Sequence, residues 1–130
     1  MQYKYHNGSG AEAQQIFVFG SNLAGIHGAG AARFAYEHYG AYWGIGYGVT
    51  GISYAIPTKE QNVITPRFLY DIKISVEKFL IWAKRYSKMS FFVTRIGCGL
   101  AGYTDEQVAP MFKGAPVNCV FPIEWKEYLE

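Results

Sequence analysis

The chain has 130 residues, of which 50% are hydrophobic and 18% are aromatic, and its net charge is +2. This composition predicts one globular domain over residues 1–130 and excludes a disordered chain. The scattered Lys and Arg residues lack the basic run of a duplex nucleic-acid-binding protein, whereas backbone amides can hold a small anionic ligand without any net charge.

The cysteines and the hydropathy of the sequence indicate the expected thiol state and the expected location of the protein. Cys98 and Cys119 have neither a CxxC nor a metal-type spacing, so we expect reduced thiols, no metal site and no cofactor. No apolar stretch is long enough to span a membrane and no signal peptide is visible, so the expected location is the cytoplasm. Nothing in the sequence indicates the oligomeric state.

Apolar runs and helical periods alternate along the chain. Polar residues 1–15 form a leading segment, with a short edge strand expected at Tyr3 to Tyr5. Strands are predicted at 16–19, 52–57, 91–96 and within 116–122, and helices at 30–40, 69–86, after residue 104 and after residue 122. Glycines at 44, 46, 48 and 51 are too dense for a regular element.

Two of the helices have a face that we expect to be buried, and a third has a recognisable start. In the first helix this face is Ala31, Phe34, Ala35 and His38, and in the second it is Leu69, Ile72, Val76, Phe79, Leu80 and Ala83. Thr104 is the expected N-cap of the third helix, because Asp105 and Glu106 in the first turn suit the helix dipole.

This order of elements predicts an α/β fold with three layers, α/β/α, around a mixed, mostly parallel sheet. In such sheets ligands bind at the carboxyl ends of the strands. Two glycine-rich loops fall there, residues 20–30 after the first long strand and residues 97–103 after the third. The loops are therefore the candidate ligand site.

Two common nucleotide motifs fit these loops poorly. Gly20 and Gly25 have the spacing of a phosphate-binding loop, but Ile26 and His27 stand where Lys and Ser or Thr should follow. Residues 97–102 match GxGxxG, yet the next helix begins beyond the third glycine and only one strand remains. Taken together, the loops instead predict a cleft in which backbone N–H groups and helix N-termini bind a phosphate or diphosphate.

The order of "IFVFGSNLAGIHGAGAARFA", "GISYAIPTK", a long helix and "FFVTRIGCGLAGYTDEQVAPMF" resembles a compact macro domain over residues 16–121. It is most similar to a small group of macro-domain-like bacterial and phage proteins that mostly lack an assigned function. Macro domains bind ADP-ribose and related NAD-derived nucleotides, and some hydrolyse ADP-ribosyl linkages. The resemblance therefore implies a macro-like fold and a small ADP-ribose-like nucleotide as the partner.

The resemblance and the residue types together define the expected site. Asn22 would lie near the distal ribose, the second loop would wrap the diphosphate, and Tyr103 would lie beside a ribose. Asn22 and His27 are the candidate catalytic residues, to position the ribose and to activate water. Macro domains carry an N-terminal Asp that recognises adenine, which this chain lacks before Glu12. The expected ligand-binding residues are Gly20, Ser21, Asn22, Gly25, Gly28, Gly30, Arg95, Gly97, Cys98, Gly99, Leu100, Ala101, Gly102 and Tyr103.

Several site residues have a structural alternative. Asn22 can form a turn, and His27 can brace its loop. Arg95 can bind a phosphate or pair with Asp105, and we favour the pair. Cys98 is better explained as a small loop residue than as a nucleophile.

Three functions remain open at this point. The protein can hydrolyse ADP-ribosyl linkages, it can sense or sequester a nucleotide without catalysis, or it can be a structural or interaction protein. Thr58 and Lys59 are weaker candidates for the same cleft.

Overall fold

The computed structural model describes residues 3–12 and 14–130. In these ranges one sheet has the strand order β1-β6-β5-β2-β4-β3. Only the β3–β4 pair is antiparallel, so the predicted mixed, mostly parallel sheet is confirmed. The strands are β1 (Lys4–His6), β2 (Ile16–Asn22), β3 (Gly48–Thr50), β4 (Ser53–Lys59), β5 (Phe91–Val93) and β6 (Cys119–Pro122).

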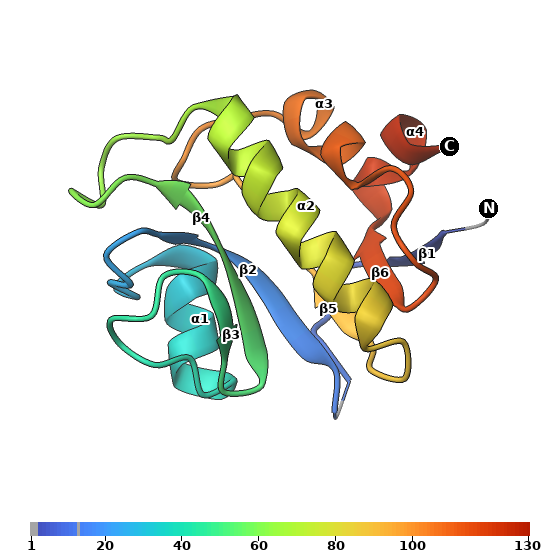
Figure 1. The fold of residues 1–130 in the computed structure, drawn as a ribbon, viewed down its shortest axis with the longest axis horizontal. Helices are drawn as coiled ribbons and strands as arrows, with labels where there is room; N and C mark the ends of the chain where they lie inside the picture. Colours follow the sequence, from blue (N-terminus) through green and yellow to red (C-terminus); the bar gives the residue numbers. More distant parts are fainter. Residues whose placement is uncertain (1–2, 13) are drawn as a thin grey trace.

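Helices cover both faces of this sheet and complete the three layers. On one face α2 crosses the strands diagonally, with α3 and α4 beside it, while α1 packs on the other face (Figure 1). The helices are α1 (Gly30–His38), α2 (Leu69–Arg85), α3 (Asp105–Val108) and α4 (Lys126–Leu129), with the 3-10 turns η1 (Ala109–Phe112) and η2 (Ile123–Trp125). No helix in the described ranges is both long and apolar enough to cross a bilayer.

The larger core lies under α2. Its buried side chains Ile72, Val76, Phe79 and Ala83 all belong to the face that the sequence predicts, whereas Leu69 and Leu80 are half-buried. Phe79 contacts the rings of Tyr54, Phe91 and Phe112. The helical period therefore identifies the main core correctly, because one face of α2 packs against β4 and η1.

A second core lies under α1 and corrects the face expected for that helix. Ala32 and Ala35 are buried, while Phe34 is 43% exposed and His38 is exposed. The sheet beneath already carries large rings, with Phe17 stacked 4.6 Å from Tyr39. Only small side chains fit between these rings and the helix, so α1 turns its alanines inward.

The ends of the strands also differ from the sequence prediction. β2 and β4 continue to Asn22 and Lys59, which pair with each other after a register shift. The glycine-rich stretch after residue 44 contains β3, a short strand that we did not expect. Gly51 lies in the turn between β3 and β4 with φ +61°. This glycine therefore allows the left-handed backbone of a hairpin turn and does not belong to an irregular loop.

The N-terminus of α3 confirms the predicted cap. The Thr104 hydroxyl accepts from the Gln107 amide at 3.2 Å, and the Gln107 side chain accepts from the Thr104 amide at 3.0 Å. This capping box fixes the chain where the second glycine-rich loop ends.

Phe79→Ala should lower the free energy of unfolding by about 4 kcal/mol, because a fully buried ring is lost from a packed core. Ile81→Ala is the matched control on the same helix, since Ile81 is 71% exposed, and should change it by less than about 0.5 kcal/mol. Urea denaturation of both variants measures the difference. Equal losses would contradict the assigned core.

Candidate functional site

A cavity of about 580 Å³ opens where the parallel strands β2 and β4 end. Eleven of the expected site residues line it: Gly20, Ser21, Asn22, Gly28, Gly30, Arg95, Gly97, Cys98, Gly99, Leu100 and Ala101. Both glycine-rich loops therefore border one cavity. Their approach is close, because a Cβ atom on Gly30 would lie 3.5 Å from the Leu100 side chain.

The N-terminus of α1 borders this cavity without a side-chain cap. Ala29 occupies the N-cap position, and the first turn contains no acidic residue. The first intrahelical donor is the Arg33 amide, which bonds the Ala29 carbonyl at 3.2 Å. The amides of Gly30, Ala31 and Ala32 meet no acceptor among the described residues. They leave a partial positive charge at the cavity wall.

The second loop adds three further amides. Its shape is held by hydrogen bonds from Gly102 to the Gly99 carbonyl and from Tyr103 to the Gly97 carbonyl, at 3.0 and 2.9 Å. The consecutive amides of residues 99–101 have no acceptor in the described chain. Such a run of free N–H groups is typical of an anion-binding turn.

The charged side chains that line the cavity are Lys59 and Arg95, and no described lining residue is acidic. Arg95 makes two hydrogen bonds to Asp105, at 3.0 and 2.7 Å, so the structural pair that the sequence favoured is present. The Trp125 indole also donates to Asp105, at 2.7 Å. The Arg95 guanidinium holds the pKa of the Asp105 carboxyl below its usual value.

Cys98 lines the cavity as a neutral thiol. Burial, followed by the nearby Asp105 carboxylate, raises its pKa to about 12. A thiol in this state carries almost no thiolate at neutral pH, so the cavity contains no activated cysteine nucleophile.

Asn22 both borders the cavity and shapes the first loop. Its side-chain oxygen accepts from the Ile26 amide at 2.9 Å, and its side-chain nitrogen donates to the Ile26 carbonyl at 2.8 Å. The residue is 4% exposed. The turn-forming alternative is therefore realised, and Asn22 holds residues 22–26 in place.

His27 lies outside the cavity, which corrects its expected position. Its Nε2 atom is 2.9 Å from the Tyr42 carbonyl, and its ring packs edge-on against Phe19 and Trp43. Only 1% of the residue is exposed. A water-activating role at the cavity does not fit this geometry, whereas bracing of the first loop does.

Three other expected residues also lie outside the cavity. The Tyr103 hydroxyl donates to the Arg67 carbonyl and so ties the second loop to the segment before α2. Gly25 has φ +71°, and a Cβ atom there would lie 2.3 Å from the Gly44 carbonyl carbon. Gly102 has φ +83°. Both positions need glycine because of their left-handed backbone conformation, and neither glycine lines the cavity.

Sequence reasoning missed part of the wall. Thr58 and Lys59, the weaker candidates, do line the cavity, together with Ile26, Ala29, Ala31, Ala32, Val63 and Thr94. Val63 comes from residues 60–66, the turn that follows β4. The sequence could have indicated that this turn lines the cavity, because it follows a strand that ends at the same edge of the sheet as β2.

A second, mostly apolar hollow of about 430 Å³ adjoins the first cavity and shares Gly30, Ala31, Thr94 and Arg95 with it. Its walls include His6, Phe17, Phe34 and Phe92. His6 stacks on Phe92 with ring centres 3.8 Å apart.

The His6 ring is held in its neutral form. Nδ1 accepts from the Gly8 amide at 3.1 Å, and Nε2 donates to the Val93 carbonyl at 2.7 Å. Burial lowers the pKa of His6. Sequence reasoning assigned this residue no role, because nothing in its neighbourhood distinguishes it.

Comparisons with known proteins bear on the fold. No family model and no curated protein sequence matches the chain. A protein of unknown function from Bacteroides thetaiotaomicron is similar in structure, with 16% identity, a TM-score of 0.63, and coverage of 94% of this chain and 98% of that one. DarTG from Thermosipho africanus, in complex with ADP-ribose, is similar with 18% identity and a TM-score of 0.54. The match covers 86% of this chain and 39% of that chain, so this chain spans about two fifths of its length.

The fold is macro-domain-like. At these identities the likeness concerns the α/β architecture alone.

The two glycines of the first loop should respond differently to alanine. Gly25→Ala is expected to lower the free energy of unfolding by roughly 3 kcal/mol, because the new methyl group meets the backbone of Gly44 in a left-handed conformation. Gly28→Ala should change it by less than about 0.5 kcal/mol, since no atom lies within 4 Å of the new Cβ. Urea denaturation compares the two, and equal effects would contradict the distinction.

Asp105→Asn should destabilise the protein by about 2 kcal/mol at pH 7, because the carboxylate accepts from Arg95 and from buried Trp125. The folded-state pKa of Asp105 is lowered. Its contribution is therefore complete above the unfolded pKa of about 3.9 and is lost as pH falls through the lower folded value. Urea denaturation across this acidic range should show wild type and variant converging. A constant difference would exclude the carboxylate as the cause.

Proposed function

We propose that the protein binds ADP-ribose or a related nucleotide that carries a diphosphate. The observation behind this proposal is that two sets of unpaired amides, residues 30–32 and 99–101, belong to residues that line one cavity. Hydrogen bonds from amides to a charged oxygen are worth about 1.5–3 kcal/mol each. A diphosphate has enough oxygens to use amides from both loops at once.

The electrostatics favour the same ligand. Lys59 and Arg95 border the cavity, and the described lining residues include no carboxylate that would repel an anion. The partial positive charge of the α1 N-terminus adds to these two cations. Arg95 already pairs with Asp105, so Lys59 and the α1 N-terminus are the groups to which an anionic ligand would bring a counter-charge.

The adjoining hollow suits the base of such a nucleotide. Its wall includes four aromatic rings together with the carboxylate of Glu124, and it shares Thr94 and Arg95 with the cavity. A flat ring stacked among Phe and His rings gains apolar burial and favourable ring contacts. The likeness to a structure solved with ADP-ribose is consistent with this arrangement.

The geometry favours nucleotide binding without hydrolysis. Within the described chain the cavity wall holds no histidine and no carboxylate, and Cys98 is a neutral thiol. Asn22 uses its side-chain amide to hold Ile26. General acid–base catalysis needs a titratable group within hydrogen-bond reach of the reacting atoms. The protein would therefore sequester or sense its nucleotide.

Gly99→Val should weaken ADP-ribose binding at least about 100-fold in calorimetric titration, because a branched side chain fills the space in front of free amides. Folding should be preserved, since no protein atom lies within 4 Å of a Cβ at this position. Leu100→Ala is the control, because it keeps the amides of the same turn, and it should alter the affinity by less than about 5-fold.

Two results would count against this proposal. Unchanged affinity in Gly99→Val would remove the second loop from the site, and a flat titration of the wild-type protein with ADP-ribose, NAD and related nucleotides would remove the ligand class. Release of ADP-ribose from an ADP-ribosylated protein or nucleic acid would replace binding with hydrolysis.

A further inference from the structure

The edge strand β3 and the loop before it form an exposed apolar surface. Residues 39–58 contain no charged side chain. Large apolar side chains nevertheless face solvent here, with exposed fractions of 65% for Tyr42, 53% for Trp43, 41% for Ile45, 73% for Tyr47, 48% for Val49 and 52% for Ile52. We call these six residues the β3 surface. Large exposed apolar surfaces commonly mark interaction sites on proteins.

The opposite edge of the sheet is built differently. There β1, a strand of three residues like β3, carries the exposed cation Lys4. Charged side chains, prolines and bulges are the usual means of keeping an edge strand from pairing. β3 has none of these, and it is hydrogen-bonded in the described sheet only to β4. The β3 edge is therefore open to another strand.

We propose that this edge pairs with the β3 edge of a second copy of the chain, antiparallel about a two-fold axis. With Val49 on the axis, Gly48 of one copy faces Thr50 of the other, and Tyr47 faces Gly51. Gly51 is the first residue of the turn after β3, and an aromatic ring opposite a glycine covers bare backbone. The strand is therefore complementary to itself, as a two-fold interface requires.

The lack of charge on the β3 surface favours a second copy of the chain over a nucleic acid or a charged peptide as the binding partner. A single-stranded nucleic acid would also use exposed aromatic rings, but it needs cations along its backbone, and residues 39–58 supply none. An acidic or basic peptide likewise meets no opposite charge. A second copy brings an equally uncharged surface, so no charge is buried without a partner.

The exposed area is also of the right size. Tyr42, Trp43 and Tyr47 expose on the order of 400 Å² together, given roughly 200 Å² for each aromatic side chain. A standard interface takes about 800 Å² from each partner. The aliphatic residues of the β3 surface and the strand edge provide much of the remainder.

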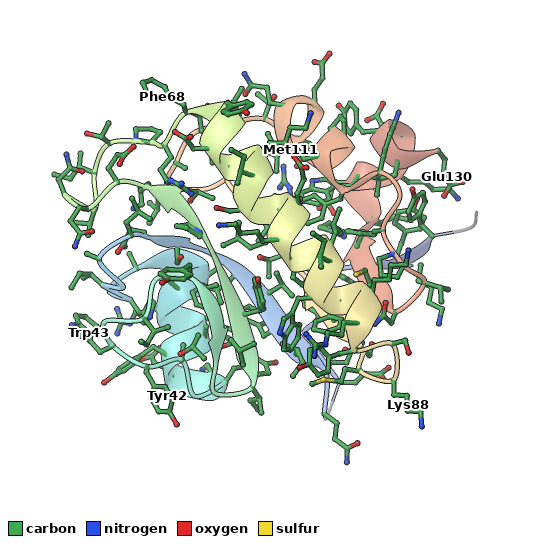
Figure 2. All side chains as sticks on the ribbon, viewed as in Figure 1. Tyr42, Trp43, Phe68, Lys88, Met111 and Glu130 are labelled. Carbon is green, nitrogen blue, oxygen red and sulfur yellow. The ribbon has the colours of Figure 1, made fainter. Side chains whose placement is uncertain are left out.

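Pairing through this surface leaves the ligand cavity open. None of the six residues lines the cavity. Figure 2 shows Trp43 and Tyr42 at the outer margin of the molecule beside α1, on the far side from α2. The dimer therefore carries two independent cavities, and its formation does not depend on the proposed nucleotide.

Sedimentation velocity should find the wild-type protein at twice the monomer mass at high micromolar concentration. Val49→Lys should shift it to the monomer, because the two-fold axis would bring two ammonium groups together. Ile81→Lys is the matched control, since Ile81 is 71% exposed on α2, and it should remain dimeric. Calorimetry with ADP-ribose should give the same affinity for Val49→Lys as for the wild type.

A cross-linking experiment tests the register separately. Val49→Cys should form an intermolecular disulfide rapidly under mild oxidation, because the two residues 49 face each other, whereas Ile81→Cys should not. A monomeric wild-type protein, or equal cross-linking of both cysteine variants, would overturn the proposal. Loss of dimer with retained ADP-ribose binding separates this result from any failure of the proposed function.

Discussion

The site depends on backbone amides that the protein leaves without internal partners. Three belong to the first turn of α1, and three to the turn over residues 99–101. An uncapped helix start is costly, since a Ser, Thr or Asp at the N-cap is worth about 1 kcal/mol over Ala. α3 in the same chain has a complete capping box. α2, like α1, begins without a side-chain cap, but only the uncapped start of α1 borders the cavity within the described chain.

The rest of the architecture holds these amides in place. Asn22 and His27 fix the first loop through Ile26 and Tyr42, and Gly25 allows it to lie directly against Gly44. On the other side Tyr103 is bonded to the segment before α2. Asn22 and His27, the two residues expected to be catalytic, both make hydrogen bonds that support this loop. Preorganised donors bind an anion strongly because little order is lost when the ligand arrives.

The sequence predicts those parts of the structure that follow from local pattern. The face of α2, the Thr104 cap and the position of both glycine-rich loops come directly from periodicity and from the order of the strands. The same reasoning fails where contacts with distant segments of the chain determine which side chains are buried. The buried face of α1 depends on the rings of Phe17 and Tyr39 beneath it, and His27 turns toward Tyr42, fifteen residues away. β3 was missed because its glycines mark a hairpin that only the pairing with β4 reveals.

The glycines illustrate why composition alone cannot separate support from ligand contact. Gly25 and Gly28 lie three residues apart in one loop, yet a methyl group on the first would meet Gly44 and on the second would meet no protein atom. Only the second kind of position is open to a ligand. Gly99 belongs to it as well, between amides that have no acceptor in the described chain. Gly28 and Gly99 thus leave open space at the cavity wall, whereas Gly30 and Gly97, which also line it, have left-handed φ values of +60° and +77° that the fold requires. The proposed anion would use the open space to approach the backbone closely.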